Sequence, residues 1–177
     1  MSSLIIYGSC YGTTKQYAEE LAKKTGIEAK SYKDVKNIND YNTVIYLGGL
    51  YAGGVEGMKK TLKNLTYTED KKIIIATVGL ADPTDKLNVE NIRMKMRSQL
   101  TPELFEKANI FHLRGGIDYS KLNFMHRSMM SLVCKKALSV PEEEKTAEIR
   151  AMIETYDKQV YFVDFGTLEP ILNALES

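Results

Sequence analysis

Small and hydroxyl-bearing residues near the N-terminus have the composition of an anion-binding loop. The loop follows an apolar run at residues 4–7 and consists of Gly8, Ser9, Cys10, Tyr11, Gly12, Thr13 and Thr14. Apolar side chains then recur at helical spacing through residues 17–24, so we expect the loop between a buried strand and a helix. The N–H groups of a helix N-terminus favour an anionic phosphate, and the hydroxyl groups add donors. The alternative is an ordinary strand-to-helix turn that a threonine caps.

Other phosphate-binding patterns are not met by this loop. The nucleoside-triphosphate pattern G-x-x-x-x-G-K-S/T needs a lysine that is missing from that frame, and the dinucleotide pattern G-x-G-x-x-G is missing as well. A phosphatase-type cysteine would need an arginine six positions after Cys10, where the sequence has Gln16. We therefore interpret Cys10 as a contributor of backbone groups.

Five apolar segments are expected to form strands, and helical patterns separate them. The strands are expected at residues 4–8, 27–32, 43–47, 72–78 and 109–114, and helices at 58–65, 89–99 and 102–107. Alternating strands and helices predict an α/β fold with a parallel sheet and right-handed crossovers. Five strands suit the doubly wound order 2-1-3-4-5, in which ligands lie off the carboxyl ends of the first and third strands. The loops after the first, third and fourth strands are therefore expected to converge.

The first loop resembles the flavodoxin phosphate loop, Ser/Thr-x-Ser/Thr-Gly-x-Thr. Ser9, Gly12 and Thr14 match this pattern, whereas Tyr11 departs from the usual hydroxyl residue at its position and Lys15 stands in place of a common acidic residue. The resemblance implies FMN as cofactor, with its phosphate held by amides and hydroxyls. It implies that the other two loops grip the isoalloxazine ring. Their residues are Leu50, Tyr51, Ala52, Gly53 and Gly54 in one loop, and Gly79, Leu80, Ala81 and Asp82 in the other.

Within these loops, Tyr51 has the side chain that could stack on a flavin ring. The glycines that follow it would let a peptide reorient as flavin N5 gains a proton. The alternatives are a surface aromatic on a glycine-rich turn for Tyr51, and a plain turn for Asp82 with Pro83.

About fifty residues lie between the fifth strand and the last helix, and they form an insertion at about residues 117–160. The segment around Gly115, Tyr119, Phe124, Arg127 and Lys135 resembles the insertion of flavodoxin-like protoporphyrinogen dehydrogenases, the menaquinone-dependent oxidases of bacterial haem synthesis. This resemblance spans nearly the whole chain. It implies that Tyr119 and Arg127 shape a pocket for a second substrate, such as a quinone or a porphyrinogen.

The insertion is expected to hold two helices. The first covers residues 119–138, with Met125, Met129 and Met130 interpreted as packing residues. Ser139 and Glu142 have the spacing of a capping box for the second. After the insertion, Thr167 is expected to cap the last helix and to place Pro170 in its first turn, with Ile171, Leu172 and Leu175 facing the core.

Whole-chain properties limit the function further. The 177 residues suit a single domain over 1–177, and a formal net charge of +1 gives no case for nucleic acid. Cys10 and Cys134 are expected to be free thiols, and the N-terminus leads directly into a strand, so we expect a cytoplasmic protein. Two histidines without metal-ligand spacing predict no metal site, and His126 is expected on an exposed polar helix face. A membrane-surface role for the basic, methionine-containing insertion is a weaker alternative.

The sequence thus predicts an FMN-binding redox flavoprotein of flavodoxin type, an electron-transfer protein or oxidoreductase. Its partner would be a redox protein or a small electron donor or acceptor, with a quinone or porphyrinogen implied by the resemblance. One alternative is a non-catalytic electron carrier. A second is a flavodoxin-fold interaction protein that has lost FMN.

Overall fold

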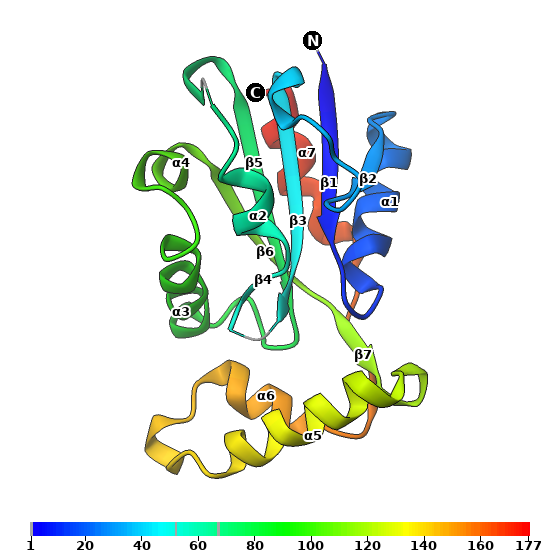
Figure 1. Ribbon diagram of the computed structural model, residues 1–177, viewed down its shortest axis with the longest axis vertical. Coiled ribbons are helices and arrows are strands. Elements are labelled where there is room, and N and C mark those ends of the chain that lie inside the picture. The colour runs from blue at the N-terminus through cyan, green and yellow to red at the C-terminus, as the bar shows by residue number, and fades with distance from the viewer. Residues whose placement is uncertain (1, 52, 67) are drawn as a thin grey trace.

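The computed structural model describes residues 2–51, 53–66 and 68–177, and its centre is a parallel sheet (Figure 1). The sheet contains β1 (Ser3–Gly8), β2 (Ala29–Ser31), β3 (Thr43–Tyr51), β5 (Lys72–Gly79) and β6 (Asn109–Arg114). These strands pair in parallel in the order β2-β1-β3-β5-β6, and the short β4 (Gly54–Val55) pairs antiparallel with β3. In chain order the five parallel strands read 2-1-3-4-5, so the predicted doubly wound α/β fold is confirmed.

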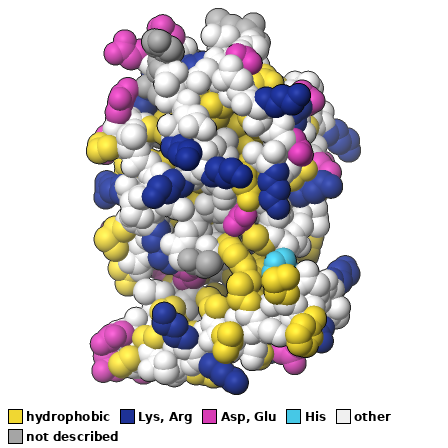
Figure 2. Space-filling model, viewed as in Figure 1, with side chains coloured by type: hydrophobic (Ala, Val, Ile, Leu, Met, Phe, Trp, Pro, Cys, Tyr) yellow, Lys and Arg dark blue, Asp and Glu magenta, His cyan; other side chains and the backbone are white. Residues whose placement is uncertain are grey.

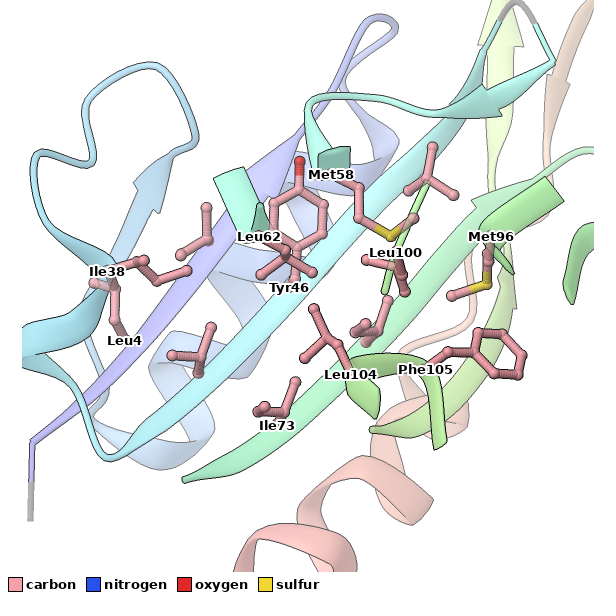
Figure 3. Packing of buried hydrophobic residues seen from close by; sticks show 14 of the residues in the cluster. Leu4, Ile38, Tyr46, Met58, Leu62, Ile73, Met96, Leu100, Leu104 and Phe105 are labelled. Carbon is pink, nitrogen blue, oxygen red and sulfur yellow. The ribbon is translucent and has the colours of Figure 1, made fainter. Parts of the chain in front are cut away.

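Helices cover both faces of this sheet. Their bounds are α1 (Thr13–Thr25), α2 (Met58–Leu62), α3 (Lys86–Arg97), α4 (Pro102–Lys107) and α7 (Glu169–Glu176). Figure 1 shows α1 and α7 on one face, and α2, α3 and α4 on the other. Each face buries its own apolar cluster because alternate strand residues point to opposite sides. Figure 3 shows one cluster, in which Tyr46 of β3 lies beside Met58 and Leu62 of α2, with Leu104 and Phe105 of α4 farther along.

Capping residues set the ends of several helices that connect the strands of the sheet. Gly26 ends α1 in the left-handed conformation, with φ of 72°, as a C-cap glycine does. Asp85 caps α3 by accepting from two backbone N–H groups, and Thr101 caps α4 ahead of Pro102. Short 3₁₀ turns are η1 (Ile38–Asp40), η2 (Thr68–Asp70) and η5 (Phe165–Leu168), of which η1 and η5 add Ile38 and Leu168 to the core.

The insertion lies across the carboxyl end of the sheet (Figure 1). It runs through β7 (Gly116–Asp118), η3 (Tyr119–Lys121), α5 (Phe124–Leu138), η4 (Glu142–Glu144), α6 (Ala147–Thr155) and β8 (Gln159–Tyr161). Strands β7 and β8 form a two-stranded antiparallel sheet, which the sequence did not predict. The insertion therefore leaves and re-enters the core through neighbouring strands. It places α5 and α6 next to the carboxyl ends of the sheet strands, below them in Figure 1.

Several predicted helix boundaries in and after the insertion are wrong. The first helix begins at Phe124 rather than at residue 119, because Asn123 caps it. Ser139 and Glu142 do not form a capping box, because the chain makes the 3₁₀ turn η4 there and Thr146 caps α6. Glu142 instead forms ion pairs with Lys145 and Arg150.

The entry into the last helix also differs from the expectation. Asp164 caps η5, and the Thr167 hydroxyl donates to the Asp164 carbonyl from within that turn. Pro170 does lie in the first turn of α7, and Ile171 packs in the core with Leu172 and Leu175 as predicted.

The methionines of α5 do not share one environment. Met130 is 7% exposed, whereas Met125 is 73% exposed, so the packing interpretation of Met125 is wrong. The buried stripe of α5 consists of Met130, Cys134 and Ala137. None of the helices among the described residues has the length and hydropathy to cross a lipid bilayer.

Candidate functional site

The loop between β1 and α1 presents a helix N-terminus without a side-chain cap. Gly12 precedes the first turn of α1 with φ of 93°, and its N–H donates to the Ser9 hydroxyl at 3.0 Å. Among the described residues no side chain accepts from the first-turn N–H groups of α1, which begin at Thr13 and Thr14. Uncapped N–H groups with nearby hydroxyls and no basic side chain in the loop form a donor set that suits a phosphate.

Thr14 lies where the ends of β1 and β3 meet. Its side chain is 3% exposed, and its hydroxyl lies 3.1 Å from the point that a Cβ atom on Gly49 would occupy. The predicted phosphate-loop threonine therefore points toward the switch point of the sheet, where doubly wound folds bind ligands.

Cys10 belongs to a polar group that the sequence did not predict. Burial, and then the nearby Glu56 carboxylate, raise the pKa of the Cys10 thiol to about 11. The Tyr32 hydroxyl donates to Glu56 Oε1 at 2.9 Å. These three residues come from the ends of β1, β2 and β4, so only the strand order brings them together. The high pKa leaves little thiolate at neutral pH, and the interpretation of Cys10 as a contributor of backbone groups stays a prediction.

Tyr11 and Tyr51 bring the first two predicted loops into contact. Their ring centroids are 6.0 Å apart, with an angle of 65° between the planes. The Tyr11 ring also meets His126 of α5 edge-on at 6.5 Å, so His126 faces the phosphate loop rather than lying on an outer polar face. Burial is the largest cause that raises the pKa of Tyr11, which stays a neutral phenol.

Two methionines of α5 reach the hydroxyl groups of these tyrosines. The Tyr11 hydroxyl lies 3.2 Å from the Met130 sulfur, and the Tyr51 hydroxyl lies 3.0 Å from the Met129 sulfur. Thioethers are polarisable and adapt to irregular apolar surroundings. Helix α5 therefore rests directly on the two loops that are predicted to hold the cofactor.

The third predicted loop, after β5, reaches the same region. Leu80 packs against the insertion cluster of Ile117, Tyr119 and Met130, and its carbonyl accepts from Arg114 Nε at 2.9 Å. The Arg114 guanidinium also lies 3.8 Å from the centre of the Phe162 ring. We did not predict a role for Arg114 from the sequence. Its position at the carboxyl end of a predicted strand could have indicated that it lies near the site.

The other predicted residues of the second and third loops have varied surroundings. A Cβ on Gly79 would lie 2.7 Å from the Leu50 side chain, so these loops touch, while Ala81 is buried. Asp82 accepts from the Thr84 N–H and hydroxyl, and these bonds lower the pKa of Asp82, which behaves here as a turn residue. Ala52 lies outside the described residues.

In the glycine-rich part of the second loop, Gly53 has φ of 84° and Gly54 pairs with Tyr51 in the β3–β4 ribbon. A Cβ atom on Gly54 would lie 2.7 Å from the Gln99 amide, so the ribbon packs closely on the end of α3.

Tyr119 and Arg127, the predicted substrate-pocket residues, are adjacent. Arg127 Nη2 donates to the Tyr119 carbonyl at 2.9 Å. The Tyr119 ring is 3% exposed and meets Tyr156 edge-on at 5.3 Å. Burial is the main cause that raises the pKa of Tyr119 to about 12. Tyr119 is thus part of the insertion core, and its role in a pocket stays a prediction.

Surface depressions of about 440 and about 560 Å³ lie along the two sides of α2. Figure 2 shows hydrophobic side chains gathered where the loops meet the insertion, and a band of Lys and Arg side chains above them, over α2. The tyrosine and methionine contacts described above belong to this junction of the loops with the insertion.

Comparison with solved structures finds flavoproteins of low sequence identity. A flavoprotein from Lactobacillus acidophilus in complex with FMN is 16% identical, with 64% of this chain and 92% of that chain covered and a TM-score of 0.41. A flavodoxin from Fusobacterium nucleatum bound to flavin mononucleotide is 19% identical, with 63% and 69% covered and a TM-score of 0.42. A cysteine-to-serine mutant of the Pseudomonas aeruginosa flavodoxin is 15% identical, with 64% and 84% covered and a TM-score of 0.42.

Comparison of the sequence with protein-family models identifies the family. No curated protein sequence matches the chain. A family model described as a flavodoxin domain matches residues 4–143, which include all three loops and helix α5. The chain belongs to the flavodoxin domain family.

Proposed function

We propose that this protein binds FMN and acts as a redox flavoprotein of flavodoxin type. One observation carries the proposal: the uncapped N-terminus of α1, with hydroxyls from Ser9, Thr13 and Thr14, lies beside the contact between Tyr11 and Tyr51. A phosphate suits the first part of this arrangement and a flat aromatic ring suits the second. Two of the solved flavoproteins compared above are complexes with FMN.

The residues of the chain would bind and orient the cofactor. Backbone N–H groups and hydroxyls of residues 9–14 would hold the phosphate, Tyr51 would contact a ring face, and residues 79–82 would border the other edge. Bound FMN supplies hydride and electron transfer. The chain's contribution is to exclude water, because α5 covers the loops through Met129 and Met130.

The finer proposal is an oxidoreductase that acts on a quinone or a protoporphyrinogen. Its support is the resemblance of residues 115–135 to the insertion of protoporphyrinogen dehydrogenases, together with the position of that insertion over the loops. Arg127 lies at the surface of the insertion and would meet an acidic substrate. A carrier without its own substrate is the second candidate, and a protein that does not bind FMN is the third.

The first experiment is a visible spectrum of the purified protein, followed by titration of the stripped protein with FMN and riboflavin. We expect flavin absorption and a clear preference for FMN. Thr14→Val should weaken FMN at least about tenfold, because a hydrogen bond to a charged group contributes about 1.5–3 kcal/mol. Riboflavin is the internal control, since it lacks the phosphate and its affinity should stay unchanged. A colourless protein that refuses FMN would overturn the proposal.

A second experiment separates the enzyme from the carrier. The FMN-loaded protein is mixed with protoporphyrinogen and menaquinone, and turnover is measured for wild type and Arg127→Gln. Turnover that falls in the variant supports the oxidoreductase. Fast one-electron exchange with neither substrate consumed supports the carrier.

A further inference from the structure

Lysines are concentrated in two segments of an otherwise balanced chain. The whole sequence has 24 Lys and Arg against 23 Asp and Glu. Residues 30–36 and 56–63 together contain six lysines against two carboxylates, those of Asp34 and Glu56. The near-zero net charge of the protein therefore conceals a local excess of positive charge.

The fold brings these two segments together around one aromatic ring. The ammonium groups of Lys33 and Lys60 lie 5.8 and 6.0 Å from the centre of the Tyr32 ring. Lys59, Lys60 and Lys63 line the depression of about 440 Å³ together with Tyr32. We call Lys33, Lys59, Lys60 and Lys63 the lysine surface; Figure 2 shows the band of Lys and Arg side chains over α2.

These four charges are not neutralised within the described part of the chain. No carboxylate there forms an ion pair with any of them, whereas the neighbouring Lys30 is 2.9 Å from Glu28. The Glu56 carboxylate accepts from the Tyr32 hydroxyl. All four lysines are exposed, so their charges act on whatever approaches this face.

The lysine surface borders the predicted cofactor site. Glu56 interacts with Cys10 in the phosphate loop, and Lys33 is close enough to lower the pKa of that thiol, against the larger effect of burial. Below the band of Lys and Arg side chains, Figure 2 shows hydrophobic side chains gathered on the same face. An apolar centre with a charged margin is typical of protein interfaces.

We propose that the lysine surface docks an acidic one-electron carrier protein next to the flavin. This inference rests on the proposed FMN function. The occupant follows from charge complementarity: four ammonium groups without an ion-pair partner among the described residues, three of them around the depression of about 440 Å³, fit a protein surface rich in carboxylates. A reduced carrier docked there would lose one electron, and FMN held by the three loops would supply the acceptor for it.

Binding to a [2Fe–2S] ferredoxin of net negative charge tests the docking directly. The labelled ferredoxin is titrated with FMN-loaded protein at about 20 and about 300 mM ionic strength, below and above the range where screening becomes strong. We expect the affinity to fall at least about tenfold at the higher ionic strength. Lys33→Gln/Lys60→Gln should weaken binding about fivefold to tenfold at low ionic strength and flatten the salt dependence.

The matched control is Lys23→Gln/Lys158→Gln, which changes net charge equally at exposed positions outside the surface. Unchanged binding in the Lys33/Lys60 variant, or equal loss in the control, would overturn the proposal. Equal affinity for a basic cytochrome, or for single-stranded DNA with the same lysine dependence, would overturn it too.

Stopped-flow mixing of reduced ferredoxin with the FMN-loaded protein adds the redox test. We expect flavin reduction that slows with salt and in the Lys33→Gln/Lys60→Gln variant but not in the control. Titrating the stripped protein separates the two proposals. Lysine-dependent ferredoxin binding by a protein that refuses FMN would support the docking and reject the FMN function. FMN binding without lysine-dependent docking would reject only the inference.

Discussion

The Tyr51 hydroxyl lies 3.0 Å from the sulfur of Met129, and this pair joins the loop after β3 to helix α5 of the insertion. The parallel contact of Tyr11 with Met130 joins the phosphate loop to the same helix. The insertion thus contacts both loops that we propose as the FMN site. A change in the packing of α5 should therefore alter the position of Tyr11 and Tyr51 in that site.

Met130→Ala should destabilise the protein by about 2–4 kcal/mol, because it empties a buried position beside Ile117 and Tyr119. Met125→Ala is the control on the same helix. Its side chain is 73% exposed, so the change should stay within about 0.5 kcal/mol. Urea unfolding measures the change in unfolding free energy for both variants, provided that the m-value, the dependence of this free energy on urea concentration, stays constant. Equal effects of the two substitutions would contradict the orientation of α5.

His112 should make the protein less stable as the pH falls from about 6.5 toward 4. Burial, and then the charge of Arg93, lower the pKa of this histidine to about 4. The folded state therefore favours the neutral ring, and the stabilisation is complete above 6.5 and lost as the pH approaches 4. His112→Gln should remove about 2 kcal/mol of this pH dependence, after allowance for partial exposure.

The measurement is the unfolding free energy of wild type and variant across that pH range. A wild-type profile that matches that of His112→Gln would reject the prediction. The loss of the contact between His112 Nδ1 and Thr77 Oγ1, 2.7 Å apart, lowers stability at every pH and does not alter the slope.

Cys10 should react slowly with a disulfide reagent at neutral pH, because its pKa of about 11 leaves little thiolate. Glu56→Gln removes a negative charge and a hydrogen-bond partner, so the pKa of Cys10 should fall and the reaction should become several-fold faster. The rates are compared in a Cys134→Ser background, so that only Cys10 is observed. A Glu103→Gln variant in the same background is the control, and an unchanged rate in Glu56→Gln would contradict the assigned contact.

Gly57→Ala should destabilise more than Gly53→Ala. Both glycines have positive φ, 72° and 84°, which costs a side chain about 1–2 kcal/mol. At Gly57 a Cβ atom would also lie 2.6 Å from the Tyr32 ring and from the Tyr46 hydroxyl, whereas nothing lies within 4 Å at Gly53. The difference between the two midpoints in urea should correspond to at least about 2 kcal/mol. Equal midpoints would show that the Tyr32 ring moves aside freely.

Strands β1, β3 and β5 could be predicted from the sequence because each contains a continuous apolar run. Ile73, Ile74 and Ile75 alternate between the two faces of the sheet, and both faces are buried under helices. An uninterrupted apolar run is therefore enough to identify β5 in the sequence. The phosphate loop and Tyr51 followed from their places after the runs in β1 and β3. Their contact is a consequence of the strand order.

The contacts between elements could not be predicted in the same way. Glu56 lies 46 positions after Cys10, and no local pattern connects the two. Helix α5 carries apolar side chains on several sides, so its periodicity did not show that Met130 and Cys134 are covered while Leu132 stays 66% exposed. The spacing of Ser139 and Glu142 matched that of a helix cap. The chain instead caps α6 with Thr146, whose hydroxyl accepts from the Ile149 N–H.

The two-stranded sheet of β7 and β8 makes the insertion an exchangeable module. Gly116 and Tyr161 are paired partners, and the Phe162 N–H donates to the Gly115 carbonyl at 2.9 Å. Paired antiparallel residues lie only about 5 Å apart, so a short turn could join them without moving β6 or α7. In evolution such a strand pair allows a cofactor-binding core to gain, lengthen or lose the inserted segment between the two strands. The substrate of the protein can then change while the parallel sheet stays the same.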